Sequence, residues 1–137
     1  MTLKDKFLNA KTLHASLTIA LEDLKLAKKN PKVEIDMGYW YIKNLSGCTV
    51  CLAGAVIMRR LKPEETICRP EELGLGQGVT ERLRAINMLR TGDIKEAVGH
   101  FYNRPAYHKK IKVKPYGERG FWSSMNMVLK FLKENNL

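Results

Sequence analysis

The stretch Cys48–Leu61, with the sequence CTVCLAGAVIMRRL, decides how this chain folds. Its middle, from Val50 to Met58, is apolar without interruption, and it ends in Arg59 and Arg60. A helix that is apolar around its whole circumference is buried on every side. The small residues of its LAGA portion also allow neighbouring backbones to approach closely. We therefore predict a central, buried helix over 48–61, around which the other elements pack.

An amphipathic helix is predicted before this segment. Apolar residues recur every three or four positions from Leu3 to Leu24, which is the spacing of one helical face. Thr2 is suited to cap the start of such a helix, and Pro31 stops it. The pattern therefore predicts one continuous helix over about 3–29.

The C-terminal half predicts a helical hairpin and a final helix. Thr80 is suited to cap the helix ERLRAINMLR, and Gly92 suits the left-handed residue that ends it. Asp93 is suited to cap the next helix, so a hairpin is predicted over 80–102. The segment FWSSMNMVLKFLKEN, which starts at Phe121, has helical spacing and predicts the last helix.

Two short strands are predicted among these helices. Apolar residues alternate with charged ones in VEI (33–35) and again in KIKVK (110–114). The lysines of the second segment would face Glu34 and Asp36 across a two-stranded ribbon, because opposite charges on facing strands attract. Between the central segment and the hairpin, an irregular connector is expected, with one helical turn over 70–73.

Length and composition agree with one ordinary domain. A chain of 137 residues, 45% apolar and 28% charged, can bury a core of its own. We expect residues 1–137 to form a single mainly α domain: a bundle of about five helices around the buried central helix (48–61), with at most one short two-stranded β-ribbon. The longest apolar run, nine residues, is under half of the roughly 20 that span a membrane. We therefore expect no membrane contact and, with three reduced cysteines and no secretory signal pattern, a cytoplasmic location.

The charge predicts an attraction to polyanions and acidic protein surfaces. Twenty-four basic residues against fourteen acidic ones leave a net charge of +10. The densest basic run is 104–119, in which lysines could meet phosphates while Tyr107 and Tyr116 stack on unpaired bases. The alternative interpretation of this run is a solvent-exposed β-ribbon that binds nothing. The candidate nucleic-acid contacts are Arg104, Lys109, Lys110, Lys112, Lys114 and Arg119.

The cysteines allow three interpretations. Cys48 and Cys51 are one helical turn apart, so with Cys68 they offer three sulfur ligands for zinc. The fourth ligand would come from one of the three histidines, yet no second paired motif is present. A redox pair is the second interpretation, and apolar packing of thiols in a buried helix is the third and favoured one. We therefore expect no cofactor, with zinc as the alternative.

No set of residues with a catalytic pattern emerges. The acidic pairs at 64–65 and 71–72 lie beside prolines and are typical of solvated turns. Gly74, Gly76 and Gly78 precede a helix, but the lysine and the hydroxyl residue of a phosphate-binding loop are missing. We therefore expect a protein that is not an enzyme.

Three stretches together resemble a known group of proteins. They are DMGYW (36–40), CTVCLAGAV (48–56) and RAINMLRTGD (84–93). Their combination is similar to a family of small, uncharacterised accessory proteins encoded mostly by tailed bacteriophages. The matching residues are Asp36, Met37, Trp40, Cys51, Ala53 and Gly54. Some relatives carry a cysteine where this chain has Ser46, with Cys48 as its earlier thiol instead, which argues against a fixed cysteine pair as a metal or redox site.

The resemblance implies a phage accessory protein that acts in the cytoplasm of the infected bacterium. It brings no established activity with it. The leading hypothesis is a non-enzymatic protein that binds and modulates a host protein through exposed aromatic residues of a loop: Tyr39, Trp40 and Tyr41. For Trp40 the alternative is a place in the core. Nucleic-acid binding through the 104–119 strip is the second hypothesis, and a zinc-stabilised domain is the third.

Overall fold

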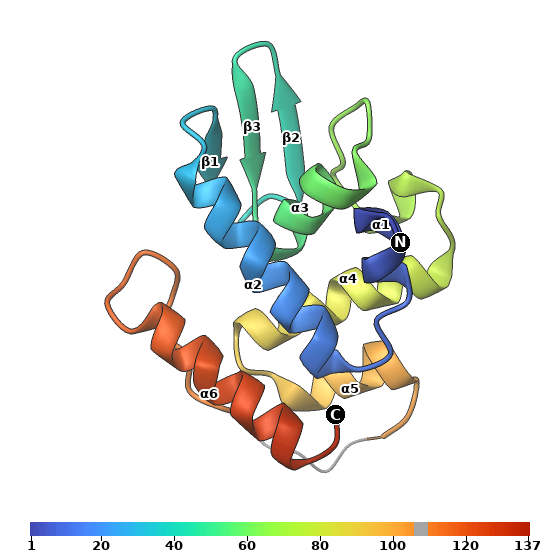
Figure 1. Cartoon of the computed structure of the whole chain (residues 1–137), viewed down its shortest axis with the longest axis vertical. Helices are drawn as coiled ribbons and strands as arrows, with labels where there is room; N and C mark the ends of the chain where they lie inside the picture. Colours follow the sequence, from blue (N-terminus) through green and yellow to red (C-terminus); the bar gives the residue numbers. More distant parts are fainter. Residues whose placement is uncertain (106–109) are drawn as a thin grey trace.

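A computed structural model describes residues 1–105 and 110–137. In this part of the chain, six α-helices form the body of the molecule, and a small three-stranded sheet extends from one end of it (Figure 1). The helices are α1 (Leu3–Leu8), α2 (Leu13–Lys29), α3 (Leu52–Val56), α4 (Gln77–Arg90), α5 (Ile94–Tyr102) and α6 (Phe121–Glu134), with a π-helical segment η1 (Ile57–Leu61) and a 3₁₀ turn η2 (Pro70–Leu73). The strands are β1 (Val33–Ile35), β2 (Tyr41–Asn44) and β3 (Gly47–Val50). The prediction of a mainly α domain is confirmed.

The central segment is buried as predicted, but its first part is a strand rather than a helix. Residues 50–57 are all buried. Gly47–Val50 forms β3, and α3 begins at Leu52 with Cys51 as its N-cap. The reason is that β1 and β2 flank this stretch on both sides and supply partners for its backbone groups. A short apolar run fits a buried strand as well as a buried helix.

The sheet has the order β1-β3-β2, and this differs from the predicted ribbon. β1 pairs in parallel with β3, with Val33 opposite Cys48, whereas β2 pairs with β3 in antiparallel fashion. The predicted pairing of 33–36 with the lysines of 110–114 is therefore wrong. Instead, the amide of Ile111 donates to the carbonyl of Gly92, beside the helical hairpin.

The predicted helix over 3–29 is interrupted. Asn9 ends α1, and Thr12 starts α2 by accepting a hydrogen bond from the amide of Ala15 at 3.0 Å. This local cap satisfies a backbone amide at the start of α2. The carbonyl of the last residue, Leu137, accepts from the amide of Leu13 at 2.6 Å, so the chain end packs against the start of α2.

The helical hairpin and the final helix are confirmed. Gly92 has a φ of +79°, and the side chain of Asp93 caps α5 by accepting from the amide of Glu96. The first helix of the hairpin begins at Gln77, earlier than predicted, so Thr80 lies inside α4 and is buried rather than serving as its cap. The helical turn predicted over 70–73 is η2.

One hydrophobic core joins all of these elements. Buried side chains from α1 to α6 and from the sheet form a single cluster, with α2 packed against α3, α4 and α6. Across the described ranges, no helix combines the length and the apolar character that crossing a bilayer requires.

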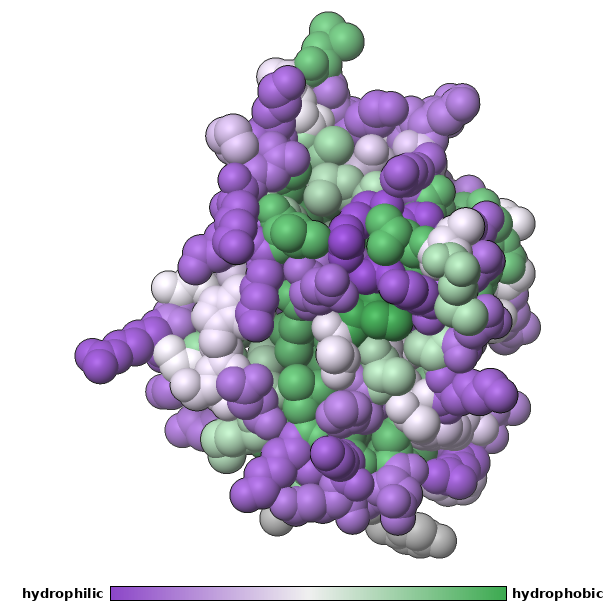
Figure 2. All heavy atoms as spheres, in the orientation of Figure 1, coloured by the Kyte–Doolittle hydropathy of each residue, from purple (hydrophilic) through white to green (hydrophobic). Residues whose placement is uncertain are grey.

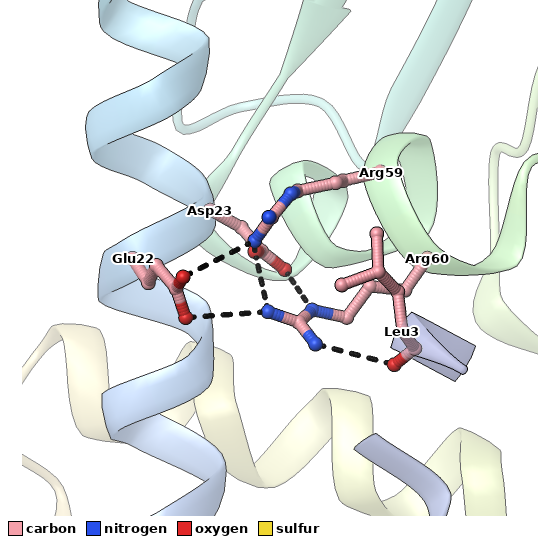
Figure 3. A network of polar contacts seen from close by, with 5 residues as sticks. All are labelled: Leu3, Glu22, Asp23, Arg59 and Arg60. Carbon is pink, nitrogen blue, oxygen red and sulfur yellow. Dashed lines mark hydrogen bonds and ion pairs between the residues drawn. The ribbon is translucent and has the colours of Figure 1, made fainter. Parts of the chain in front are cut away.

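A buried ion-pair cluster fixes the position of α2 (Figure 3). The Asp23 side chain has no exposed surface, and both of its oxygens accept from the Arg60 guanidinium, at 2.7 and 2.9 Å. Arg59, the preceding residue of η1, also donates to Asp23, at 2.6 Å. Arg60 further donates to the carbonyl of Leu3 and pairs with Glu22. One aspartate thus ties α2 to η1, and through Arg60 to α1.

Candidate nucleic-acid interface

The residues of the basic strip predicted over 104–119 lie in different surroundings in the structure. Arg104 lies over the ring of Tyr102, 4.9 Å from its centroid, and Lys110 lies 4.0 Å from the carboxylate of Asp93. Both cations therefore have partners within the protein, although the Lys110 side chain remains 77% exposed. Lys109, together with Tyr107, lies outside the described residues. Lys112 is exposed beside α6 and lines a shallow hollow.

The C-terminal part of the strip reaches the first turn of α6. The amide of Lys114 donates to the Ser124 hydroxyl at 3.1 Å, and the loop that follows carries the exposed Arg119 directly before α6 begins. This loop also carries one carboxylate, Glu118. Just beyond this loop, the start of α6 lies beside charges from another part of the chain.

Those charges are three lysines at the C-terminal end of α2. Lys25, Lys28 and Lys29 are all exposed, and their spacing places them on one face of the helix. The Lys25 ammonium lies 5.5 Å from the centroid of the Trp122 ring, at the start of α6. The three lysines and Trp122 line a hollow of about 400 Å³. We call Lys25, Lys28, Lys29 and Trp122 the basic–aromatic surface.

The Trp122 ring is held in place by two other aromatic rings. Its centroid lies 5.1 Å from that of Phe121 and 6.5 Å from that of Tyr116, and both pairs are edge-to-face. Tyr116 and Phe121 also contact each other edge-to-face, and burial raises the pKa of Tyr116. Trp122 itself is partly buried against the core. Its ring therefore packs against two other rings on one side and lies beside the exposed lysine side chains on the other.

The sequence analysis missed the lysines of α2. Lysines at a helix C-terminus are usual because they compensate the helix dipole, so they did not stand out as candidate contacts. Their spacing at 25, 28 and 29 was a visible signal of one charged face. Nothing in the sequence placed that face beside Trp122, because only the packing of α2 against α6 brings them together.

The aromatic loop predicted to contact a protein is mostly structural. Tyr41 begins β2 and is only 4% exposed, so the prediction of an exposed contact is wrong for this residue. Burial and the neighbouring Cys48 thiol raise the pKa of Tyr41 to about 12. Trp40 is partly buried against the core, and Tyr39 remains 49% exposed.

The cysteines do not form the zinc site that stood as the alternative to apolar packing. Cys51 is buried, its Sγ accepts from the amide of Gly54 at 3.3 Å, and it contacts the side chain of Asn87. Cys48 lies on β3 near the Tyr41 hydroxyl, and Cys68 is exposed in the connector. Within the described ranges, no three His, Cys, Asp or Glu side chains are grouped to hold a metal ion. The set Cys48, Cys51 and Cys68 is therefore wrong as a ligand set.

The Cys51 thiol is also unsuited to nucleophilic attack. Burial raises the pKa of Cys51, which disfavours the thiolate that such chemistry requires. The hydrogen bonds from Gly54 and Asn87 oppose this effect and are the weaker influence. Cys51 acts instead as a helix cap that sits within the core.

A second exposed feature is the tip of the β2–β3 hairpin. Figure 2 shows hydrophobic atoms at the extremity of the molecule where this hairpin ends. Leu45 occupies the turn and is fully exposed. An apolar side chain that protrudes in this way has no packing role in the isolated molecule.

Comparison with known proteins finds no match: no family model, no curated protein and no solved structure is similar to this chain.

Proposed function

We propose that this protein is a non-enzymatic accessory protein of a tailed bacteriophage, that it acts by binding a host macromolecule, and that nucleic acid is the ligand that its surface suits best. The phage origin is supported by the motif resemblance at 36–40, 48–56 and 84–93. The observation that carries the choice of ligand is the meeting of the α2 lysines with Trp122.

The arrangement combines the two components of a nucleic-acid interface. Lysines on flexible stems neutralise phosphates and release counterions, which provides most of the affinity for nucleic acid of any sequence. An aromatic ring beside them offers a surface for a base. The net charge of +10 adds attraction at longer range. In contrast, only one of the three aromatic residues proposed as protein contacts is well exposed.

The proposal that the protein is not an enzyme is supported by the burial and the raised pKa of the Cys51 thiol. A reactive cysteine is partly exposed and has a lowered pKa, whereas Cys51 is buried and has a raised one. The segment 48–56, one of the three stretches that carry the resemblance, therefore contributes mainly to the core, and binding is assigned to the surface.

The test measures binding of a fluorescently labelled oligonucleotide by fluorescence anisotropy at low salt, about 50 mM. We expect the wild-type chain to bind and the triple variant Lys25→Glu, Lys28→Glu, Lys29→Glu to lose about tenfold or more in affinity. The matched control changes three exposed lysines near the N-terminus by the same charge: Lys4→Glu, Lys6→Glu and Lys11→Glu. An equal loss in the control, or no binding by the wild type, would contradict the proposal.

A protein partner is the second candidate function, favoured by the exposed Leu45 at the hairpin tip and by Tyr39. Capture from a nuclease-treated bacterial lysate tests it, with Leu45→Asn as the variant. A protein retained by the wild type and lost with Leu45→Asn supports a host-protein contact at the tip. A protein that disappears on nuclease treatment was bound through nucleic acid instead.

A further inference from the structure

Trp122 distinguishes between single-stranded and double-stranded nucleic acid as ligands of the basic–aromatic surface. A row of lysines responds to phosphate charge, which single strands and duplexes both carry. An indole face, however, stacks only on a base whose own face is free. In a duplex, the faces of interior bases are covered by their neighbours. The position of Trp122 among the lysines is therefore a feature that separates the two classes of ligand.

The face of Trp122 toward α2 opens onto the hollow lined by the three lysines. The edge-to-face contacts with Tyr116 and Phe121 fix the plane of the ring. What lies over the ring is the ammonium of Lys25, an exposed and flexible side chain. The Lys25 ammonium covers the ring in the free protein, but a ligand can displace it, because the exposed lysine side chain can rotate away at little cost in free energy.

We propose that the surface binds single-stranded nucleic acid, with one unpaired base stacked on Trp122 in the place that the Lys25 ammonium occupies in the free protein. The displaced ammonium then joins Lys28 and Lys29 in contacting the phosphates on either side of that base. This inference rests on the proposed nucleic-acid-binding function and specifies its ligand.

The exchange is favourable because each group gains a stronger partner. An exposed cation–π contact is weak, whereas stacking of a base on an aromatic ring is stronger and requires no particular base. The ammonium in turn exchanges the ring for a phosphate. Sequence preference is therefore expected to be slight, and the preference for unpaired strands is expected to be clear.

The fluorescence of Trp122 tests the proposal directly. The chain has two tryptophans, Trp40 and Trp122, so a Trp40→Phe variant leaves Trp122 as the single reporter. We expect oligothymidylate to quench this fluorescence and to bind about tenfold more tightly than a duplex with the same number of phosphates. Inorganic polyphosphate, a polyanion without bases, should bind without comparable quenching.

Two further variants separate stacking from charge. Trp122→Leu should lower the affinity for oligothymidylate about tenfold and leave the affinity for duplex and polyphosphate unchanged. The double variant Lys28→Ala, Lys29→Ala should weaken the binding of oligothymidylate, duplex and polyphosphate alike. Trp122→Phe, which keeps an aromatic face, should recover most of the lost affinity. Thermal melting of each variant confirms that it is folded. The quenching measurement uses protein in which Trp122 is unchanged, so it does not depend on whether a Trp122 variant folds.

The outcomes distinguish this inference from the function on which it rests. If duplex and single strand bind equally and Trp122 is not quenched, while the lysine variant still weakens binding, the inference is overturned and nucleic-acid binding stands. If neither nucleic acid binds at low salt, both are overturned. Quenching with a clear preference for the single strand, lost in Trp122→Leu, supports the inference.

Discussion

At the scale of single residues, Asp23 is a charged side chain that joins α2 to η1. It is fully buried and accepts hydrogen bonds from both Arg59 and Arg60. A buried charge is tolerated only when it is paired, and removing one partner leaves the other uncompensated. The two arginines looked in the sequence like the polar end of an apolar helix, and their shared partner on α2 was not predictable from spacing.

Replacement of Asp23 should therefore destabilise the fold strongly. We expect Asp23→Asn to lower the free energy of unfolding by about 3–5 kcal/mol, because Arg60 keeps its buried charge and loses its buried counter-charge, so that the largely exposed Glu22 remains. Glu22→Gln is the matched control: this neighbour pairs with the same arginines, but its side chain is 59% exposed. It should change stability by about 0–1 kcal/mol. Urea denaturation measures both, and a loss below about 1 kcal/mol for Asp23→Asn would contradict this account of the cluster.

Two buried groups predict a loss of stability at alkaline pH. Burial raises the pKa of Cys51 above its ordinary value of 9.0, and that of Tyr41 from 10.0 to about 12. A group whose pKa is higher in the folded state stabilises fully below its unfolded pKa, and this contribution is lost as the pH rises through the folded pKa. The free energy of unfolding should therefore fall as the pH rises above 9. Urea melts across this range measure it, and Tyr41→Phe should reduce the part of the fall above pH 10.

At the scale of elements, Gly54 sets how closely the aromatic loop approaches α3. A Cβ at this position would lie 1.7 Å from the carbonyl oxygen of Trp40, which is backbone and cannot move aside alone. Because Gly54 has no Cβ, the backbone of Trp40 lies directly against α3, while the Tyr39 side chain remains 49% exposed.

Gly54→Ala should consequently disrupt the contact between the loop and α3. We expect a loss of about 3 kcal/mol or more in the free energy of unfolding, comparable with other cases of forced overpacking. Gly99→Ala in α5 is the control, because a Cβ there meets open space. That change should stabilise by about 0.5–1 kcal/mol, as expected for glycine to alanine in a helix. A Gly54→Ala protein as stable as the wild type would show that the loop is free to shift.

The elements also show how far sequence reasoning reached. The hairpin of α4 and α5 and the last helix were predictable because their signals are local: Gly92 with positive φ, the Asp93 cap and helical spacing. The strand β3 was mistaken for helix because a run that is apolar on all sides has no period to distinguish the two. The pairing of β1 with β3 depends on contacts that no local pattern encodes.

At the scale of the whole molecule, the candidate site is assembled from two distant parts of the chain. Trp122 lies three residues beyond Arg119, the last residue of the strip at 104–119, and the packing of α2 against α6 brings the lysines of α2 beside it. Arg104 and Lys110 were drawn into contacts within the protein. Charge density along the sequence is thus a partial guide to charge density on the surface, because folding superimposes segments that lie far apart.

The salt dependence of binding tests the central claim, that the α2 lysines and Trp122 form a nucleic-acid interface, most directly. For a single strand, each phosphate neutralised contributes about 0.7 to the slope of log affinity against log salt concentration. Alanine at Lys25, Lys28 and Lys29 together should therefore reduce the slope for oligothymidylate by about 2, while alanine at Lys4, Lys6 and Lys11 leaves it unchanged. An unaltered slope in the first variant, or an equal reduction in both, would contradict the claim.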